Sequence, residues 1–417
     1  TLDTWFSSGL WTFSTLGWPN QESDIKTFHP TSWMQMGYEI LYLWLMRMVL
    51  MSTYNLDQIP FKDAYIHGML RDKDGQKFSK SAGNGIDPVE VMEKYGTDAL
   101  RWSLLSGISQ GNDSKFYLEK VEGSRNFVNK LWNVSRFILM NIDEPKINIE
   151  KPEAKTLADR WILEELENIK HKVKNGFDAY NFSFVGEQLR DFTWNELADW
   201  YLEIAKVEES KSEILNYILN TILKLWHPFV PFVTETIWTE IYGEKQMLVI
   251  EKWPQAVEGK GNSTADFDLI RDIVTGIRSL KSDYKIDPVK KLSVVISAGD
   301  KKALLKENVE VIKHLARLDD ISIEEKTEKP EDHVGFVVGG IEVFIDLTGV
   351  VDVDKEKIRL ETEIKQLSGY VIGLNKKLSN KEFTKNAPKE VVEKEQEKLE
   401  EGKVKLGKLE EQLKSLN

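Results

Sequence analysis

Hydrophobic residues in the middle of the chain recur at the spacing of amphipathic helices. The clearest runs are 121–140, 160–169 and 182–205. A stripe of apolar side chains every three to four residues is buried when helices pack together. Residues 115–275 are therefore predicted to form a helical bundle, with most of its aromatic side chains in the core. Ahead of the bundle, residues 94–101 are predicted to lead into a helix that Asp98 is able to cap.

The hydrophobic period becomes that of strands after residue 276. The segment divides into a strand, a helix, a second strand and a hairpin, at 292–296, 301–317, 321–323 and 334–347. Gly339 and Gly340 separate the arms of the hairpin, and such pairs adopt the tight turns that join antiparallel strands. Residues 276–350 are predicted to form a small α/β module without catalytic chemistry.

Residues 351–417 carry apolar positions at alternating spacings of three and four, interrupted at Asn386-Ala387-Pro388. This pattern predicts two helices that pair as an antiparallel coiled coil within one chain. Lysines gather toward the predicted tip, at Lys365, Lys376, Lys377, Lys381, Lys385 and Lys389. A charge run of this size is usually a solvated face, and the alternative is a contact with an anionic partner.

The beginning of the chain is predicted to be part of an α/β unit. It opens on an apolar stretch interpreted as a strand that ends in a Ser/Gly turn, and an apolar helix follows over 36–47. Gly37 lies at the start of this helix and Glu39 in its first turn. A close backbone followed by an acid suits the phosphate or ribose of a nucleotide, although Glu39 could simply interact with the helix dipole.

The loop at 75–85 is the most informative stretch of the sequence. Lys77 and Lys80 lie there among glycines and serines, between a predicted strand over 64–70 and a helix that starts near Pro88. Glycines permit a mobile loop that approaches a ligand closely, lysines offer point charges for phosphate oxygens, and serine hydroxyls donate hydrogen bonds. The simpler alternative is a solvated basic turn.

The composition narrows the possible functions. The 417 residues carry a net charge of −12, no cysteine and six scattered histidines, so neither disulfides nor a metal site is predicted and a reducing cytosol is expected. The length predicts about two to four domains. The acidic balance argues against a protein that coats nucleic acid, but permits an RNA partner bound by local basic patches. The longest apolar run, 40–51, is too short to span a bilayer.

The loop at 75–85 closely resembles the KMSKS signature loop of class I aminoacyl-tRNA synthetases. Further motifs resemble, in order, the second half of the catalytic domain of the valyl-tRNA synthetase family, at 3–11, 14–19, 37–41, 67–68 and 77–84. Three later runs are similar to helices of the family's anticodon-binding bundle, at 124–133, 199–203 and 227–233. Isoleucyl enzymes usually have Asp at the position of Ser7 and a cysteine-ligated zinc tail, so Ser7 and the missing cysteines favour the valyl family.

The resemblance implies a multidomain protein of α/β and all-α parts, the C-terminal portion of a longer enzyme. The implied parts are the second half of a Rossmann-like catalytic domain (1–60), a stem-contact region with the KMSKS-type loop (61–114), a helical anticodon-binding domain (115–275), the small α/β linker module (276–350) and a tRNA-binding coiled-coil arm (351–417). The HIGH-motif half and the editing domain are expected upstream of Thr1. The fragment alone is therefore expected to be inactive, and the protein is expected to be a cytoplasmic monomer.

The resemblance also implies ATP-dependent activation of valine, with Mg²⁺ and without zinc, followed by transfer to tRNA(Val). Lys77 and Lys80 are the implied catalytic contacts to phosphate. The implied ATP-binding residues are Gly37, Glu39, His67, Gly68, Lys77, Ser79, Lys80 and Ser81. Trp5, Ile40 and Trp44 are implied to line the valine pocket, although each could be ordinary core. The implied tRNA contacts are Arg125, Asn126, Lys130, Arg136, Lys376, Lys377, Lys381 and Lys385.

Three positions depart from the family's pattern. Phe78 stands where Met is commonest, Glu39 where Asp is usual, and Gly85 where Val is usual. Phe78 keeps an apolar anchor and Glu39 keeps the acid, whereas Gly85 is expected to loosen the loop. Two other functions stay open: a fragment of an isoleucyl-tRNA synthetase, and a tRNA-binding fragment without catalysis.

Overall fold

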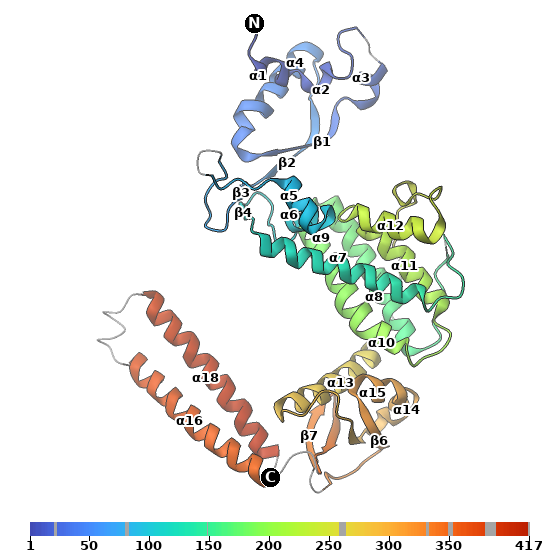
Figure 1. Ribbon diagram of the computed structural model, residues 1–417, viewed down its shortest axis with the longest axis vertical. Helices are drawn as coiled ribbons and strands as arrows, with labels where there is room; N and C mark the ends of the chain where they lie inside the picture. The colour runs from blue at the N-terminus through green and yellow to red at the C-terminus, as the bar shows by residue number, and fades with distance from the viewer. Residues whose placement is uncertain are drawn as a thin grey trace. The chain divides into compact units, whose positions relative to one another are not determined.

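The computed structural model describes most of the chain. The described residues are 1–20, 23–79, 83–147, 149–257, 264–330, 333–348, 353–379 and 389–415. The chain divides into two compact units, the first from 1–202 with 210–262 and the second from 203–209 with 263–417 (Figure 1). None of the helices in the described ranges is both long and apolar enough to cross a membrane.

The first unit begins with two parallel strands. β1 (Thr31–Gly37) pairs with β2 (Phe61–His67). Three short helices precede the strands: α1 (Thr4–Gly9), α2 (Trp11–Ser14) and α3 (Ser23–Phe28). Three consecutive helical segments connect them: η1 (Tyr38–Ile40), η2 (Leu41–Leu45) and α4 (Met46–Leu56). The buried centre of this crossover is a cluster of Met34, Met36 and Met48. A helical crossover of this kind is what joins parallel strands.

Two details of this region differ from the prediction. The opening stretch forms helix α1 instead of a strand, because the side chain of Asp3 accepts a hydrogen bond from the amide of Trp5 and caps the helix. The apolar helical segment begins at Tyr38 and not at Met36, because β1 continues to Gly37.

The next part of the first unit surrounds the lysine-containing loop, residues 75–85. β3 (Leu70–Arg71) pairs in parallel with β4 (Ser114–Lys115), and α5 (Pro88–Tyr95) and α6 (Thr97–Leu105) lie between them in the chain. The predicted helix start at Pro88 is confirmed. Asp87 precedes it and accepts a hydrogen bond from the amide of Val89, which caps α5.

Asp98 caps a different helix from the one predicted. It lies inside α6, is only 5% exposed, and accepts hydrogen bonds from the amides of Phe232 (3.3 Å) and Val233 (2.6 Å). Both amides belong to the first turn of α12 (Pro231–Tyr242), where backbone N–H groups have no partner within the helix. Burial raises the pKa of the Asp98 carboxyl, and the two amides oppose this by stabilising its charged form.

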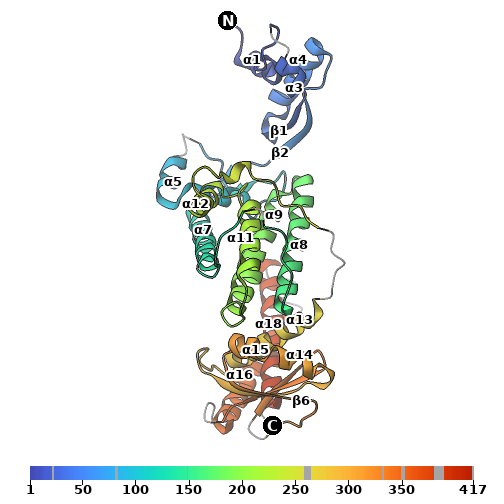
Figure 2. The same cartoon turned by 90° about the vertical axis from the view of Figure 1, so that its right-hand side faces the viewer.

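Helices dominate the rest of the first unit, as the hydrophobic period predicts. They are α7 (Leu118–Leu139), α8 (Leu157–Asp178), α9 (Phe182–Asp191), η3 (Phe192–Tyr201), α11 (Ser212–Trp226), α12 and η4 (Leu248–Ile250). The short helix α10 (Leu202–Ile204) begins at the last residue before the segment 203–209 of the second unit. Figure 2 shows α7, α11 and α8 running alongside one another. Trp102, Phe127, Trp226 and Phe229 are buried together, with ring centroids 4.7–6.2 Å apart in the contacting pairs. These aromatic side chains are core, as predicted.

The second unit contains the predicted α/β module. α13 (Ala265–Asp283) accompanies a four-stranded sheet in the order β6-β5-β8-β7. The strands are β5 (Leu292–Ser297), β6 (Leu318–Glu324), β7 (His333–Val338) and β8 (Ile341–Asp346). The predicted hairpin is confirmed, because β7 and β8 are antiparallel and Gly339 and Gly340 turn between them with φ of 55° and 80°. Positive φ at both turn positions is what a two-residue hairpin turn requires.

The helix predicted over 301–317 is interrupted. η5 (Gly299–Lys301), α14 (Lys302–Glu307) and α15 (Val309–Ala316) occupy this segment, with Asn308 between the last two. The side-chain amide of Asn308 donates to the carbonyl of Leu304 at 2.8 Å. Asparagine competes in this way with the helical hydrogen-bond pattern of the backbone, which accounts for the break.

Two long helices end the chain. α16 (Val353–Ser379) and α18 (Lys389–Ser415) pack against each other in antiparallel directions (Figure 1). The predicted apolar seam lies between them, with Leu360, Leu374, Leu399 and Leu409 buried. The residues between the two helices, which include Lys381 and Lys385, lie outside the described ranges.

Replacing Asp98 by Ala is expected to lower the free energy of unfolding by about 2 kcal/mol, because two partly buried amides of α12 would lose the carboxylate that accepts from them. Asp98→Asn is the matched control, since one acceptor oxygen remains and the decrease should be under half as large. Urea denaturation followed by tryptophan fluorescence measures both. Equal stability of wild type and Asp98→Ala would show that water satisfies the helix start.

Candidate functional site

The parallel pairing of β1 and β2 brings the predicted nucleotide-binding residues together. Gly37 and His67 are direct partners in the strand register, at the carboxyl edge of the pair. Glu39 follows in η1, and its carboxylate lies over the Gly37 backbone: a Cβ added to Gly37 would be 2.4 Å from Glu39 Oε2. His67 Nδ1 donates to the carbonyl oxygen of Gly68 at 2.7 Å, which leaves Nε2 as an acceptor. Ligands of open parallel sheets bind at this edge.

Only glycine fits at position 68, because the backbone of Asn112 passes very close to it. A Cβ at this position would lie 2.0 Å from the carbonyl oxygen of Asn112. The neighbouring Asp113 then holds the segment in place, because its carboxylate accepts hydrogen bonds from the Met69 amide at 2.7 Å, the Tyr38 hydroxyl at 3.1 Å and Arg71 Nε. These partners, with the Met69 amide first, lower the pKa of the Asp113 carboxyl.

A second carboxylate closes the base of the lysine-containing loop. Asp72 accepts hydrogen bonds from the amides of Asp74 and Gln76 and, at 2.8 Å, from the side-chain amide of Asn84. Asn84 in turn accepts from the amide of Ser79 at 3.0 Å and donates to the carbonyl of Lys77 at 3.2 Å. The bond from Asn84 is the main cause of the lowered pKa of the Asp72 carboxyl. Asn84 therefore ties both arms of the loop together.

Of the two lysines of the loop, Lys77 is the one that the structure describes. The side chain of Lys77 is exposed and forms no ion pair with any described carboxylate. Phe78 packs beside the buried cluster of Val91, Leu100 and Val121, so it is an apolar anchor as predicted. The predicted residues Lys80 and Ser81 lie outside the described residues.

The residues predicted to line a valine pocket are close to one another but partly occupied by structural contacts. Ile40 and Trp44 pack against the methionine cluster of the crossover, and Trp44 Nε1 donates to the carbonyl of Ser8 at 3.0 Å. Trp5 lies in α1, where the guanidinium of Arg47 covers its ring at 5.0 Å. Each of these predicted residues is only partly buried, which leaves part of its surface available to a ligand.

The predicted RNA contacts of the bundle all lie on α7. Asn126 and Arg136 are exposed. Arg125 pairs with Glu122 at 3.6 Å and Lys130 with Asp199 at 3.3 Å, and Lys130 also lies over the Trp194 ring. The four residues therefore do not have equal access to an anionic ligand.

Two of the predicted tRNA contacts, Lys376 and Lys377 of α16, also differ in whether they form an ion pair. Lys377 of α16 pairs with Glu395 of α18 at 3.0 Å, whereas Lys376 is exposed and pairs with no described carboxylate. Glu395 also accepts from Lys398, and its two lysine partners lower the pKa of its carboxyl. Sequence proximity alone suggested that few acidic groups face the tip, and the antiparallel partner helix supplies Glu395.

Sequence reasoning missed the carboxylates that position the site. Asp72 precedes a turn at Asp74-Gly75, a pattern typical of side-chain-to-backbone turns, so its role could have been found. Asp113 had no such signal, because its partners Tyr38 and Arg71 are 75 and 42 residues away in sequence.

The class of protein follows from comparison with family models. Residues 1–117 match the model of class I tRNA synthetases (I, L, M and V), and 159–296 match the anticodon-binding domain of tRNA ligases. Residues 352–417 match the valyl tRNA synthetase tRNA binding arm. The chain thus contains part of a class I tRNA synthetase catalytic domain and an anticodon-binding domain, and the resemblance found in the sequence is confirmed.

Individual relatives point to one member of that class. The chain is 39% identical to the valine–tRNA ligase of Clostridium acetobutylicum, over 100% of this chain and 49% of the relative. It is 39% identical to that of Geobacter sulfurreducens, over 96% and 47%. The chain spans about half the length of these relatives. Among solved structures, the LeuRS–tRNA–LeuAMS complex of Agrobacterium radiobacter K84 matches 61% of this chain and 34% of that chain, with a TM-score of 0.54 and 22% identity, which supports the fold alone.

Replacing Asn84 by Ala is expected to open the loop without unfolding the unit. The Ser79 amide would lose its bond to Asn84 Oδ1 and Asp72 would lose one donor, so hydrogen exchange at Ser79 should accelerate about tenfold, the equivalent of one hydrogen bond. In the control variant Asn84→Asp, the new carboxylate can still accept from the Ser79 amide, but it cannot donate to Asp72 and lies next to that like charge. Exchange at Ser79 equal to that of wild type in Asn84→Ala would mean that Asn84 does not hold the loop.

Proposed function

We propose that this chain is the C-terminal part of a valine–tRNA ligase, which activates valine with ATP and transfers it to tRNA(Val). The observation that carries the proposal is the 39% identity to valine–tRNA ligases along the whole chain. The geometry supports it, since Gly37, Glu39, His67 and Gly68 meet at the edge of the sheet where a nucleotide binds.

The lysine-containing loop would act on the phosphates of ATP. Attack of the valine carboxylate on the α-phosphorus releases pyrophosphate and builds negative charge on the leaving phosphates. Lys80 and Lys77 would stabilise that charge, with Ser79 and Ser81 donating hydrogen bonds, so their effect would appear in the rate more than in binding. In this proposal Mg²⁺ would be bound to the ATP phosphates.

The site is proposed to need residues outside this chain. Within the described residues the first sheet has two parallel strands, whereas parallel sheets are normally wider and covered on both faces. Apolar side chains beside it are exposed, with Tyr42 at 78%, Leu50 at 61% and Tyr54 at 89%. Such side chains are buried when further structure packs on them, which suits a catalytic domain completed by another segment.

The surfaces for tRNA are proposed to lie on two elements. Arg125, Asn126, Lys130 and Arg136 of α7 would contact the RNA from the anticodon-binding domain. α16 and α18 would form a coiled-coil arm whose tip carries Lys376, Lys377, Lys381 and Lys385. We also propose that the chain divides into the five domains given in the sequence analysis. The protein is proposed to be monomeric and cytoplasmic.

In the complete protein, valine-dependent ATP–pyrophosphate exchange is expected to exceed isoleucine-dependent exchange. Lys80→Ala should slow it by about 10²–10³-fold, because the charge that develops in the transition state would no longer meet this cation, and Lys77→Ala should also slow it. Lys73→Ala is the matched control, an exposed lysine in the turn just before the loop. Exchange driven by isoleucine, or equal rates for Lys80→Ala and Lys73→Ala, would contradict the proposal.

Replacing Lys376, Lys377, Lys381 and Lys385 by Gln is expected to raise KM for tRNA and to reduce the salt dependence of tRNA binding. The log–log slope should fall by just under about one unit for each phosphate that no longer meets a lysine. Valine activation should not change. Four lysines along α18, Lys398, Lys403, Lys405 and Lys414, replaced together by Gln, form the control with equal charge. If both variants bind tRNA alike, the tip is only a solvated surface.

A further inference from the structure

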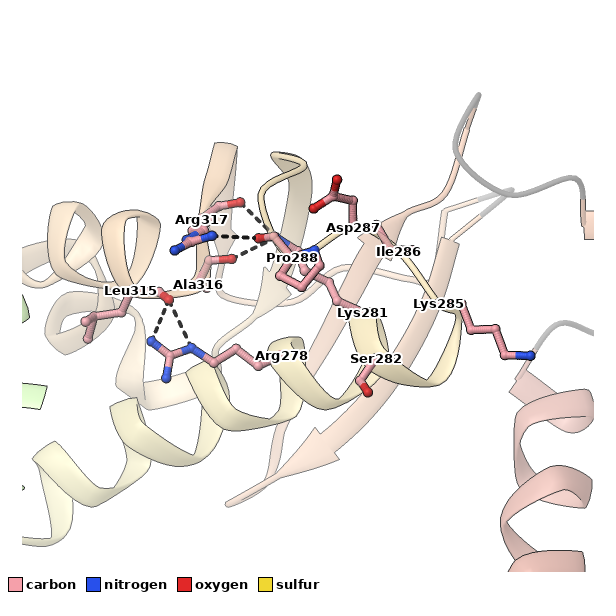
Figure 3. Close-up of a pocket in the computed structure, with 10 residues that line it drawn as sticks. All are labelled: Arg278, Lys281, Ser282, Lys285, Ile286, Asp287, Pro288, Leu315, Ala316 and Arg317. Atoms are coloured by element: carbon pink, nitrogen blue, oxygen red, sulfur yellow. Dashed lines mark hydrogen bonds between the residues drawn. The ribbon is translucent and has the colours of Figure 1, made fainter. Parts of the chain in front are cut away.

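The second unit contains a pocket of about 560 Å³ between the end of α13 and the turn after α15 (Figure 3). Its charged lining consists of Arg278, Lys281, Lys285, Arg317 and one carboxylate, Asp287. This volume is within the range of pockets that hold small molecules or single groups of a larger ligand.

Two of the cations are held by the carboxyl end of α15. Lys281 is 4% exposed and its ammonium donates to the carbonyls of Lys290, Ala316 and Arg317 at 2.9–3.0 Å. Arg278 donates through Nε and Nη2 to the carbonyl of Leu315. Carbonyls at a helix end lack partners within the helix, so both cations cap α15. Figure 3 shows these bonds converging from α13 on the end of α15.

This capping satisfies hydrogen bonds but leaves an excess of positive charge. Lys281, Lys285 and Arg317 form no ion pair with any described carboxylate. Asp287 accepts from the amide of Val289 at 2.9 Å. Burial, followed by the charges of Arg317 and Arg278, lowers the pKa of Lys281 to about 8. The ends of α13 and α15 each contribute roughly half a negative charge, which together with Asp287 offsets about two of the three positive charges of Lys281, Lys285 and Arg317.

The two exposed cations stand where the chain leaves its helices. Lys285 and Arg317 both have positive φ, 53° and 52°, in the turns that end α13 and α15. Arg317 is fixed by a bond from Nη1 to the carbonyl of Pro288, whereas Lys285 extends from the rim (Figure 3). The pocket therefore has three cations bound to backbone carbonyls and a fourth, Lys285, at its rim, and Pro288 and Ile286 add apolar surface to the lining.

We propose that this pocket binds a phosphate of the tRNA backbone, with the adjoining ribose against Pro288. The inference rests on the proposed function and adds a contact to it, in the module between the bundle and the arm. A phosphodiester suits the site because it brings a charge to the cations and an uncharged sugar to the apolar rim. Contacts of this kind position RNA without reading its bases.

The test compares tRNA(Val) binding by the complete protein and two double variants over a range of salt concentrations. Lys285→Gln with Arg317→Gln is expected to raise Kd about three- to tenfold near physiological salt, and to lower the log–log salt slope by about 0.7–0.9 for each phosphate that no longer meets a cation. Lys306→Gln with Lys326→Gln removes the same charge from exposed positions that do not line the pocket, and should leave the slope nearly unchanged.

Each outcome has a distinct meaning. If the two variants have equal affinities and slopes while wild type binds tRNA, the pocket proposal is wrong and the proposed function stands. If inorganic pyrophosphate stabilises wild type but not the pocket variant, and tRNA binding is the same in both, the ligand is a free phosphate compound and the RNA proposal is again overturned. If wild type does not bind tRNA(Val), the proposed function itself fails.

Discussion

The parallel pairing of β1 with β2 is the constraint on which the candidate active site depends. It places Gly37 directly opposite His67, and both following segments leave from the same edge. Side chains alternate between the two faces of a strand, so a slip of one residue would exchange buried Met34 and Met36 for exposed neighbours. The methionine cluster thus fixes the register, and the register fixes which backbone groups lie at the edge that carries the candidate site. Asp113 then extends this order to the next strand pair through Tyr38, Met69 and Arg71.

The cations of this acidic chain fall into groups with different roles. Lys211 lies buried 2.6 Å from Asp159, and such a pair holds helices together without access to RNA. Lys130 and Lys377 form partly exposed pairs, which typically contribute about 0–1 kcal/mol, so a phosphate could displace either carboxylate at little cost. Lys77, Lys376 and Arg317 need no such exchange. A net charge of −12 therefore coexists with several places suited to phosphate.

The elements that sequence predicted well are those specified by neighbouring residues. The hairpin turn at Gly339-Gly340 needs only two residues that tolerate positive φ, and the start of α5 needs only Asp87 and Pro88. Some predictions failed on local contacts, such as the Asp3 cap of α1, and another failed because the deciding contact is distant in sequence. Asp98 has the local pattern of a cap for α6, but its partners are 134 and 135 residues away.

The candidate site was likewise predicted only in part from the sequence. The residues of its motifs could be predicted one by one, since a glycine or a lysine in a known motif is visible in the sequence. The network that ties Asp72, Asn84 and Ser79 together could not, because it depends on how the loop folds back on itself. The contact of Lys377 with Glu395 was not predicted either, because the apolar pattern indicates antiparallel pairing but not which charged side chains face one another across it.

The most direct test of a divided active site is to reconstitute the proposed enzyme from two separate polypeptides. The purified 417-residue chain should form no valyl-tRNA from valine, ATP and tRNA(Val), because under the proposed function the nucleotide site is completed by another segment. Adding the remainder of the enzyme as a separate polypeptide should restore valyl-tRNA formation, and Lys80→Ala in this chain should abolish the restored activity. Valyl-tRNA formation by the 417-residue chain alone would contradict the site described here.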